Sequence, residues 1–410
     1  MTLSRRSFMT HAALGAGLLA TSSAQDVTTI PGFDDKKTEI DDSQVWQQKF
    51  DRKIKMGLVG YGLCEFAVHF CLQHHPNVEV VAVSDIIPER CAAMAKAAKC
   101  EKTYPSLEEM VKDDSIEAIF VATDAPSHGR HCVEVLKHGK HVASAVPAVW
   151  GNLEEADMLY EMVKKTGLTY MMFETSALHD DLHAMRQIYK AGGFGKLIYT
   201  EGEYFHIMPT PLPSYKDWRV GLPPQWYPTH GNAYYVAVTG GSFTEVSCMG
   251  NRCRFPHFLP ENNVYKNPFG SEIALLRTSE GGMARMAVGW DVGIGGETGR
   301  ISGEKGMFWK GSYSPDVYSR SQAEVGELVK MVNGLNLKRP PLPPTVAAND
   351  PGYHGGSHGP LGHEFVMSIL ENRKPLVHIA WALNMTVAGI VAHQSAMKDG
   401  ELLKIPQYSF

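Results

Sequence analysis

The sequence lacks a long hydrophobic run, a basic excess and a regular cysteine pattern, and each absence excludes a class of protein. No apolar stretch approaches the roughly 20 residues that span a bilayer, so we expect no membrane insertion of the mature chain. The formal net charge of -5 at pH 7 gives no positive field for nucleic acid. The seven cysteines are an odd set without repeated spacing. Only Cys248 and Cys253 are candidates for a disulfide, on weak grounds.

The N-terminus carries the pattern of an export signal. The twin arginines Arg5 and Arg6 precede the apolar run AALGAGLLA and the small-residue sequence SSAQ. This order is typical of a twin-arginine (Tat) signal peptide. We predict that residues 1–24 are such a signal, that the mature protein is periplasmic or otherwise exported, and that the polar residues 25–52 form an exposed arm or linker.

The remaining chain is long enough for two domains. The full sequence of 410 residues is 44% hydrophobic, as in ordinary globular proteins. In residues 53–175, apolar segments such as VEVVAVSD, IEAIFVAT and LTYMMFE alternate with helical segments, which predicts a parallel sheet of βαβ units. In residues 176–410, strand-like segments are separated by glycine-rich turns. The predicted fold class is therefore α/β, with an N-terminal Rossmann domain and a C-terminal α/β domain that contains a large, predominantly antiparallel open sheet.

A glycine turn follows the first predicted strand, in the segment GYGLCE. Gly60 permits a tight turn, and Gly62 lets the backbone approach a pyrophosphate at a helix N-terminus. Glu65 stands where the dinucleotide-binding pattern G-x-G-x-x-G has its third glycine. Asp85 ends the second strand, where an acid binds the adenosine ribose and favours NAD over NADP. These features predict an NAD site.

Several segments together resemble the Gfo/Idh/MocA family of oxidoreductases. They are GLVGYG, VAVSD, VATDAPSH, VLKHGKHV and GGFGKLIYTEGE. The resemblance implies a sugar or cyclitol bound between the domains against the nicotinamide, and an open sheet that packs on a partner subunit, hence a homo-dimer or homo-tetramer. The predicted cofactor-binding residues are Gly60, Gly62, Leu63, Asp85, Thr123, His128 and Pro147.

The segment SAVPAV departs from this family. Ala145, Val146 and Pro147 stand where the family has Glu-Lys-Pro, whose lysine hydrogen-bonds the reacting hydroxyl. Val146 has no side-chain atom that can do so. The sequence therefore lacks the usual residues for simple alcohol dehydrogenation.

A second resemblance accounts for the valine. The segments WYPTHGNAYYV, YHGGSH and GHEFVMSILENRKP are similar to glycoside hydrolase family 109, a branch of the same superfamily that commonly has Glu-Val-Pro at this position. It implies tightly held NAD and cleavage of a glycosidic bond by transient oxidation, elimination, addition and reduction. Val146 fits this branch, while Ala145 departs from it.

His230 is the predicted catalytic residue, because imidazole exchanges protons near neutral pH. We expect it to act as a neutral base, assisted by Tyr227; the alternatives are a helix-capping histidine and a packing aromatic. The predicted substrate-binding residues are His179, Trp218, Arg219, Trp226 and His354. Aromatic faces with an arginine suit sugars, although a loop that packs on its own aromatics is equally compatible. No metal site is predicted, since the pair His179 and His183 and the run from His354 to His363 are better explained without one.

The predicted function is that of an exported NAD(P)-dependent enzyme of the oxidoreductase type, acting on a carbohydrate. No pool of free NAD is maintained outside the cytoplasm, so a tightly bound cofactor must be restored within each cycle. One alternative is a glycosidase of the family 109 type. The other is a non-catalytic carbohydrate-binding relative, which the loss of both ionisable residues at Ala145 and Val146 would fit.

Overall fold

The computed structural model describes residues 45–293 and 295–409. The predicted signal peptide and most of the predicted arm lie outside the described residues. Residues 45–52 have no regular secondary structure and are mostly exposed. None of the helices described in these two ranges is long and apolar enough to cross a bilayer.

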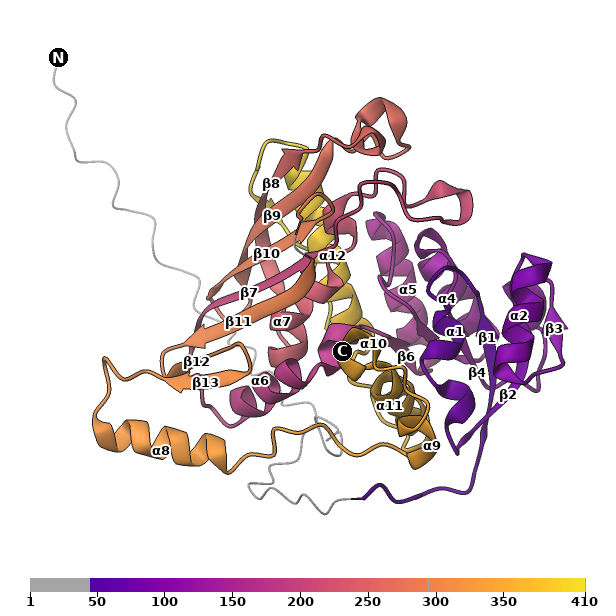
Figure 1. Ribbon diagram of the computed structural model, residues 1–410, viewed down its shortest axis with the longest axis horizontal. Coiled ribbons are helices and arrows are strands. Elements are labelled where there is room, and N and C mark those ends of the chain that lie inside the picture. The colour runs from indigo at the N-terminus through magenta and orange to yellow at the C-terminus, as the bar shows by residue number, and fades with distance from the viewer. Residues whose placement is uncertain (1–44, 294, 410) are drawn as a thin grey trace, which may run out of the picture.

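The first layer is a parallel sheet of six strands in the order β3-β2-β1-β4-β5-β6 (Figure 1). Strands such as β4, in which all four residues are buried, are hydrophobic throughout because helices cover both faces. The chain moves outward from β1 on both sides, which leaves a crevice at the carboxyl ends of β1 and β4. The strands are β1 (Ile54–Val59), β2 (Val78–Ser84), β3 (Thr103–Tyr104), β4 (Ala118–Val121), β5 (His141–Ser144) and β6 (Tyr170–Met172).

Helices with clear end signals cover this sheet. The side chain of Asn152 accepts the backbone N–H groups of Glu154 and Glu155 at the start of α5, and Gly167 ends that helix in the left-handed conformation. Asparagine is a common residue at the start of a helix, and glycine is common just after its end. The helices of this domain are α1 (Phe66–His69), α2 (Pro88–Ala98), α3 (Leu107–Met110), α4 (His128–Lys137) and α5 (Leu153–Thr166).

The helix expected after the glycine turn is present but short. Helix α1 has four residues and follows Glu65, which is left-handed at φ 47°. Cys71 is left-handed too, at φ 58°. Left-handed residues interrupt a right-handed helix at both ends. A helix of one turn has few aligned peptide dipoles, so its N-terminus adds little positive field to the groove beside it.

The second layer is an eight-stranded sheet in the order β13-β12-β11-β7-β10-β9-β8-β14. Only β7 and β10 pair in parallel among its described strands, which confirms the predominantly antiparallel sheet. Its strands are β7 (Leu197–Phe205), β8 (Phe243–Arg252), β9 (Phe269–Thr278), β10 (Met283–Gly289), β11 (Gly296–Gly303), β12 (Gly306–Trp309), β13 (Ser312–Pro315) and β14 (Leu403–Lys404).

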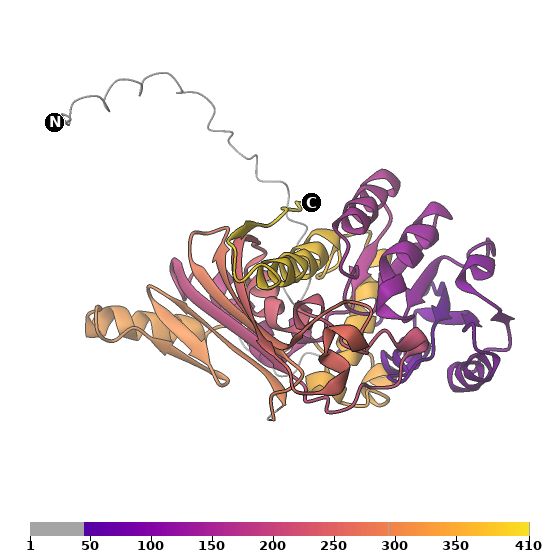
Figure 2. The ribbon, with the colours of Figure 1, turned by 90° about the horizontal axis from the view of Figure 1, so that it is seen from above.

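The faces of this sheet differ. In β9, Ala274 and Leu276 are buried beneath helices, whereas Ile273 and Leu275 are exposed on the opposite face. Helices α7 and α12 lie on the covered face (Figure 2). Helix α12 also contacts α5 and β6, so the two domains share one hydrophobic core. The helices of this domain are α6 (Asp180–Lys190), α7 (Thr229–Thr239), α8 (Gln322–Asn333), α9 (Pro344–Ala347), α10 (Tyr353–Gly356), α11 (His358–Leu370) and α12 (Ile379–Ala396).

The cysteines form no disulfide. All seven are free thiols, so the structure does not contain the pair considered for Cys248 and Cys253. Cys248 is buried in β8, and burial raises the pKa of its thiol.

Candidate active site

Two cavities meet between the domains. The nucleotide groove runs along the carboxyl ends of the parallel strands, from Asp85 past the glycine turn to Val146. The histidine cavity lies beyond Val146 and is lined by His230, His354 and several aromatic rings. The residues that line both are Cys64, Phe66, Ala145, Val146, Arg219 and Tyr227. A ligand in the groove can therefore reach a second ligand in the cavity.

The residues of the glycine turn fit a dinucleotide. Gly60 has φ +93°, and a Cβ there would lie 2.4 Å from the carbonyl oxygen of Ala122, so the backbone itself requires glycine. A Cβ on Gly62 would meet no protein atom within 4 Å. Since Gly62 lines the groove, that space is available for the close approach of a pyrophosphate.

Asp85 lies where an acid can bind the ribose. Its carboxylate accepts the backbone N–H groups of Tyr61 and Ile87, at 2.7 and 2.8 Å. These bonds fix the carboxylate beside the turn and leave lone pairs on both oxygens for hydroxyl groups.

The other predicted cofactor residues surround the same groove. Leu63 and Thr123 line it. His128 lies in its wall, where its ring nitrogens lie 2.9 Å from the carbonyl oxygen of Pro147 and 3.1 Å from that of Thr123. Burial lowers the pKa of His128. Pro147 supports this histidine and is not itself among the lining residues.

The side of the junction that follows β5 is apolar. Strand β5 ends at Ser144, and the chain then presents Ala145 and Val146 to both cavities. Neither side chain can hydrogen-bond or ionise. Proton transfer must therefore come from another wall of the histidine cavity.

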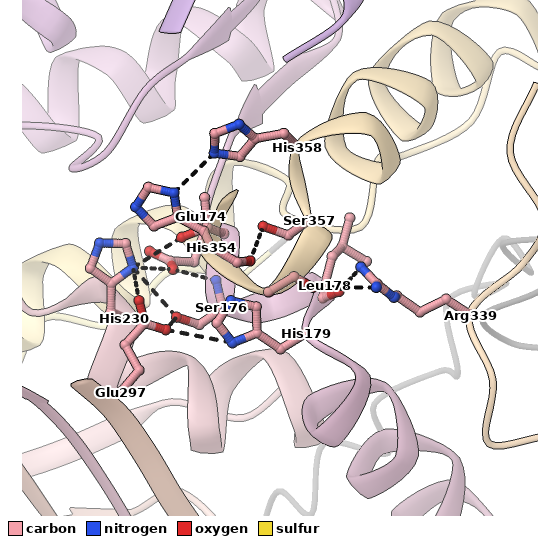
Figure 3. A network of polar contacts seen from close by, with 12 residues as sticks. Glu174, Ser176, Leu178, His179, His230, Glu297, Arg339, His354, Ser357 and His358 are labelled. Atoms are coloured by element: carbon pink, nitrogen blue, oxygen red, sulfur yellow. Dashed lines mark hydrogen bonds and ion pairs between the residues drawn. The ribbon is translucent and has the colours of Figure 1, made fainter. Parts of the chain in front are cut away.

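His230 provides an ionisable group on that wall. It is the second residue of α7, is 3% exposed, and places Nδ1 2.7 Å from Oε1 of Glu174 (Figure 3). Oε1 of Glu297 lies 3.8 Å from the same nitrogen. Ser176 donates its hydroxyl to Oε2 of Glu297 at 2.6 Å. The two carboxylates thus hold one edge of the imidazole.

The protonation of His230 differs from the neutral state expected from the sequence. Burial by itself lowers its pKa, but the charges of Glu174 and Glu297 and the hydrogen bond to Glu174 outweigh burial and raise the pKa to about 9. His230 is therefore a cation at neutral pH, since buried charge is retained where opposite charge surrounds it. In this state it donates hydrogen bonds and cannot accept a proton.

His354 has the opposite shift. Its ring stacks beside His230 with 6.4 Å between centroids, and its Nδ1 lies 3.0 Å from Nε2 of His358. Burial and the positive charge of His230 lower the pKa of His354. Arg339 fixes this segment by donating to the carbonyl oxygens of Gly356 and Leu178. The cavity thus pairs a charged imidazole with a neutral one.

Two tyrosines complete the cavity. Tyr227 and Tyr204 stack at 6.2 Å, and both contact His230. Burial raises the pKa of each hydroxyl, so both stay protonated. They can donate to a ligand oxygen.

The predicted substrate residues divide into two groups. Arg219 and His354 line the histidine cavity, and Trp218 lines the nucleotide groove. Trp226 instead packs against Trp150, Tyr265 and His393 and lines neither cavity.

His179 lies behind the cavity. Its Nδ1 is 3.6 Å from Glu297, and it lines neither the groove nor the cavity. Within the described ranges, no group of three His, Cys, Asp or Glu has the geometry to hold a metal ion.

Three residues of the site were not predicted from the sequence. Glu174 follows the last parallel strand after Phe173, in a position where acids commonly face a ligand crevice, so this signal was available. Tyr204 and Glu297 lie in β7 and β11, where nothing in the sequence distinguishes them from other strand residues.

Comparison with known proteins agrees with the fold. Residues 54–174 match the Gfo/Idh/MocA model, described as an oxidoreductase family with an NAD-binding Rossmann fold. A scyllo-inositol dehydrogenase from Lactobacillus casei, with bound NAD(H) and scyllo-inositol, has the same fold at a TM-score of 0.62 and 17% identity, covering 86% of this chain and 99% of that one.

Curated relatives belong to a hydrolase family. Glycosyl hydrolase family 109 protein 1 from Bacteroides fragilis is 27% identical over 192 residues, which is 43% of this chain and 41% of the relative. An α-N-acetylgalactosaminidase from the same species is 30% identical over 146 residues, 33% of this chain and 34% of that protein. The match thus spans less than half of these relatives' length. Residues 54–174 are similar to the NAD-binding domain of the Gfo/Idh/MocA family, and the similarities support an enzyme of this type.

Proposed function

We propose that this protein is a carbohydrate-acting enzyme that keeps NAD bound and returns it to its starting redox state in each cycle. One observation carries the proposal: the nucleotide groove opens at Ala145 and Val146 into a cavity with a charged and a neutral histidine. Gly62 and Asp85 bind the dinucleotide, and its nicotinamide lies towards the junction. When bound, NAD accepts and returns a hydride at a carbon of the sugar.

Side chains of the histidine cavity donate and accept the protons of the reaction. The cationic His230 donates a hydrogen bond from Nε2 to a sugar oxygen and stabilises negative charge that develops on it. Glu174 and Glu297 hold the proton on His230. Tyr227 donates from the adjacent wall.

His354 accepts the proton of the oxidised hydroxyl. Nδ1 of His354 and Nε2 of His358 lie 3.0 Å apart. We assign Nδ1 of His354 as the donor of this bond, which leaves the lone pair on its Nε2 to accept the proton. Environments that push two pKa values apart define an acid and a base.

The lining of the cavity suits a sugar. Tyr204, Tyr227 and Trp290 offer aromatic faces to the C–H faces of a pyranose. His206 adds a polar group for hydroxyls on the same wall. This mixture of rings and polar groups favours a carbohydrate over an apolar substrate.

A second candidate function is glycoside cleavage by transient oxidation. It is favoured by the family 109 relatives and by Val146, which removes the lysine of an ordinary dehydrogenase. The same His230 and His354 would then move protons at the carbon and the leaving oxygen.

The first test is extraction of the purified protein. Heat denaturation should release about one NAD per chain, whereas absence of any dinucleotide and no rise in melting temperature with added NAD would contradict the proposal. Aryl glycosides that release phenol without an added acceptor support the glycosidase. Turnover only with an added ketose supports coupled oxidation and reduction of two sugars, and saturable sugar binding without either reaction supports a binding protein.

Export and self-association are part of the proposal. The twin arginines Arg5 and Arg6 support export, and a reporter fused to residues 1–24 tests it. The exposed side chains Met249, Ile273, Leu275 and Met283 lie on strands of the open sheet and support a homo-dimer or homo-tetramer. Analytical ultracentrifugation distinguishes these from a monomer.

A further inference from the structure

One wall of the nucleotide groove comes from the C-terminal domain. It belongs to residues 209–222, between β7 and α7, which we call the groove loop. In Figures 1 and 2 this segment extends from the sheet domain towards the Rossmann domain. The groove-lining residues of the loop are Pro213, Ser214, Tyr215, Lys216, Trp218 and Arg219.

The groove loop is anchored at its centre and at its end. Trp218 is buried and packs edge-on against Trp150 of the N-terminal domain, with ring centroids 5.1 Å apart. The Tyr265 hydroxyl donates to the carbonyl oxygen of Trp218 at 2.7 Å. The indole of Trp290 donates to the carbonyl oxygen of Leu222 at 3.0 Å. These contacts fix the backbone on both sides of Arg219.

Arg219 presents an uncompensated charge to the groove. Its guanidinium stacks on the Trp218 ring at 4.2 Å from the centroid, and its backbone N–H donates to Ser214. Among the described residues, no carboxylate pairs with it. Its charge reaches the junction, because it opposes the rise that burial causes in the pKa of the Cys64 thiol. A planar guanidinium held in this way suits a phosphate.

The glycine turn needs such a cation. A typical Rossmann site binds the pyrophosphate at the N-terminus of a long helix, behind a third glycine. Here α1 has only four residues, and the carboxylate of Glu65 replaces that glycine. Glu65 lies 3.8 Å from His69 and adds negative charge near the turn. The N-terminal domain alone therefore offers the two phosphate charges a weak site.

We propose that Arg219, held on Trp218, binds the pyrophosphate of the dinucleotide and that the groove loop thereby retains NAD between cycles. This inference rests on the proposed NAD-dependent function and names the residue that makes the cofactor resident. This assignment makes Arg219 a cofactor-binding residue, whereas the sequence predicted that it binds the substrate. Lys216, which is exposed at the rim of the groove, adds a weaker, screened charge.

The test compares phosphate-bearing and phosphate-free ligands. Protein freed of nucleotide by unfolding in denaturant and refolding is titrated calorimetrically with NAD, ADP and adenosine, for wild type, Arg219→Gln and Arg219→Lys. Arg219→Gln should weaken NAD and ADP on the order of tenfold to a hundredfold, as expected for lost hydrogen bonds to a charged group. Arg219→Lys should lose less, and adenosine affinity should not change.

The matched control is Arg254→Gln. Arg254 is exposed, whereas Arg219 is half-buried. Like Arg219 it stacks on an aromatic ring, that of Phe255 at 5.6 Å, but it lies outside the groove. Its variant should bind all three ligands as the wild type does.

Three outcomes overturn the inference. The first is an unchanged NAD affinity in Arg219→Gln. The second is a loss of adenosine affinity equal to the loss of NAD affinity. The third is weaker sugar binding with NAD affinity intact, which would make Arg219 a substrate-binding residue. A wild type that binds no dinucleotide contradicts the proposed function itself, so the two failures are distinguishable. Unchanged adenosine affinity also shows that the variant is folded.

Discussion

The nucleotide groove and the histidine cavity share a wall but differ in construction. On its N-terminal side the groove is formed by short segments that follow β1, β2 and β4, and backbone geometry at Gly60 and Gly62 decides its shape. The cavity is formed by side chains from distant segments, with His230 and His354 in its wall and Glu174 paired with His230 behind it. The backbone fold therefore determines the shape of the groove, whereas the charges of individual side chains determine the chemistry of the cavity. Substitutions should affect binding in one region and proton transfer in the other.

The largest effect is expected for His230→Ala. Loss of a positioned proton-transfer group typically lowers the rate on the order of a hundredfold to ten-thousandfold. The variant should still contain NAD, because His230 does not line the groove. Turnover and extracted NAD are measured together. Near-normal turnover would reduce His230 to a helix-capping residue, and loss of NAD would show that the two regions are not separable.

Glu174→Gln should change the pH dependence of the cavity. The charge of Glu174 helps to raise the pKa of His230 to about 9, so the variant's His230 should lose its proton at lower pH. The alkaline limb of the activity profile should therefore begin at lower pH in the variant than in the wild type. At pH 8 we expect the activity of the variant to be about tenfold below that of the wild type. Glu297→Gln is the matched comparison and should shift the profile less, because Glu297 is 3.8 Å rather than 2.7 Å from Nδ1. Identical profiles would contradict this.

Two alanine substitutions separate shape from function in the groove. Gly60→Ala should lower the free energy of unfolding by about 1–3 kcal/mol, because a side chain is strained at φ +93° and meets the carbonyl oxygen of Ala122. Gly62→Ala should leave the melting temperature unchanged and weaken NAD binding. Equal melting temperatures for both variants would refute this distinction.

The ion pair of His230 should also contribute to the free energy of unfolding in a pH-dependent way. Its pKa is raised from 6.5 to about 9, so its contribution is complete below pH 6.5 and is lost as the pH rises towards 9. The difference in unfolding free energy between wild type and His230→Gln should therefore shrink across this window in urea titrations. A constant difference would mean that the histidine is neutral in the folded protein.

The smallest effect is expected for Trp226→Phe. Trp226 packs against Trp150 and His393 outside both cavities, so sugar affinity should change by less than about threefold, while the melting temperature falls. A large loss of sugar affinity at unchanged stability would place Trp226 in the site after all.

The fold and the groove were predictable from the sequence, because hydrophobic periodicity and glycines act locally. The brevity of α1 was not, since the left-handed Glu65 and Cys71 are not residue types that favour that conformation. The cavity was predictable only in part. His230 stands out in its loop, but its charge depends on Glu174, 56 residues away in the chain, and on Glu297. Trp226 and Trp218 look alike in one loop, and only tertiary packing separates them.

Four of the seven tryptophans, Trp150, Trp218, Trp226 and Trp290, gather around the cleft between the domains. Reduced nicotinamide absorbs light where tryptophan emits it, and the oxidised form does not. Indoles this close to the proposed nicotinamide site would transfer their excitation to it only while it is reduced. The intrinsic fluorescence should therefore dip and recover within a single turnover, giving an optical record of a redox cycle that leaves no net product of oxidation.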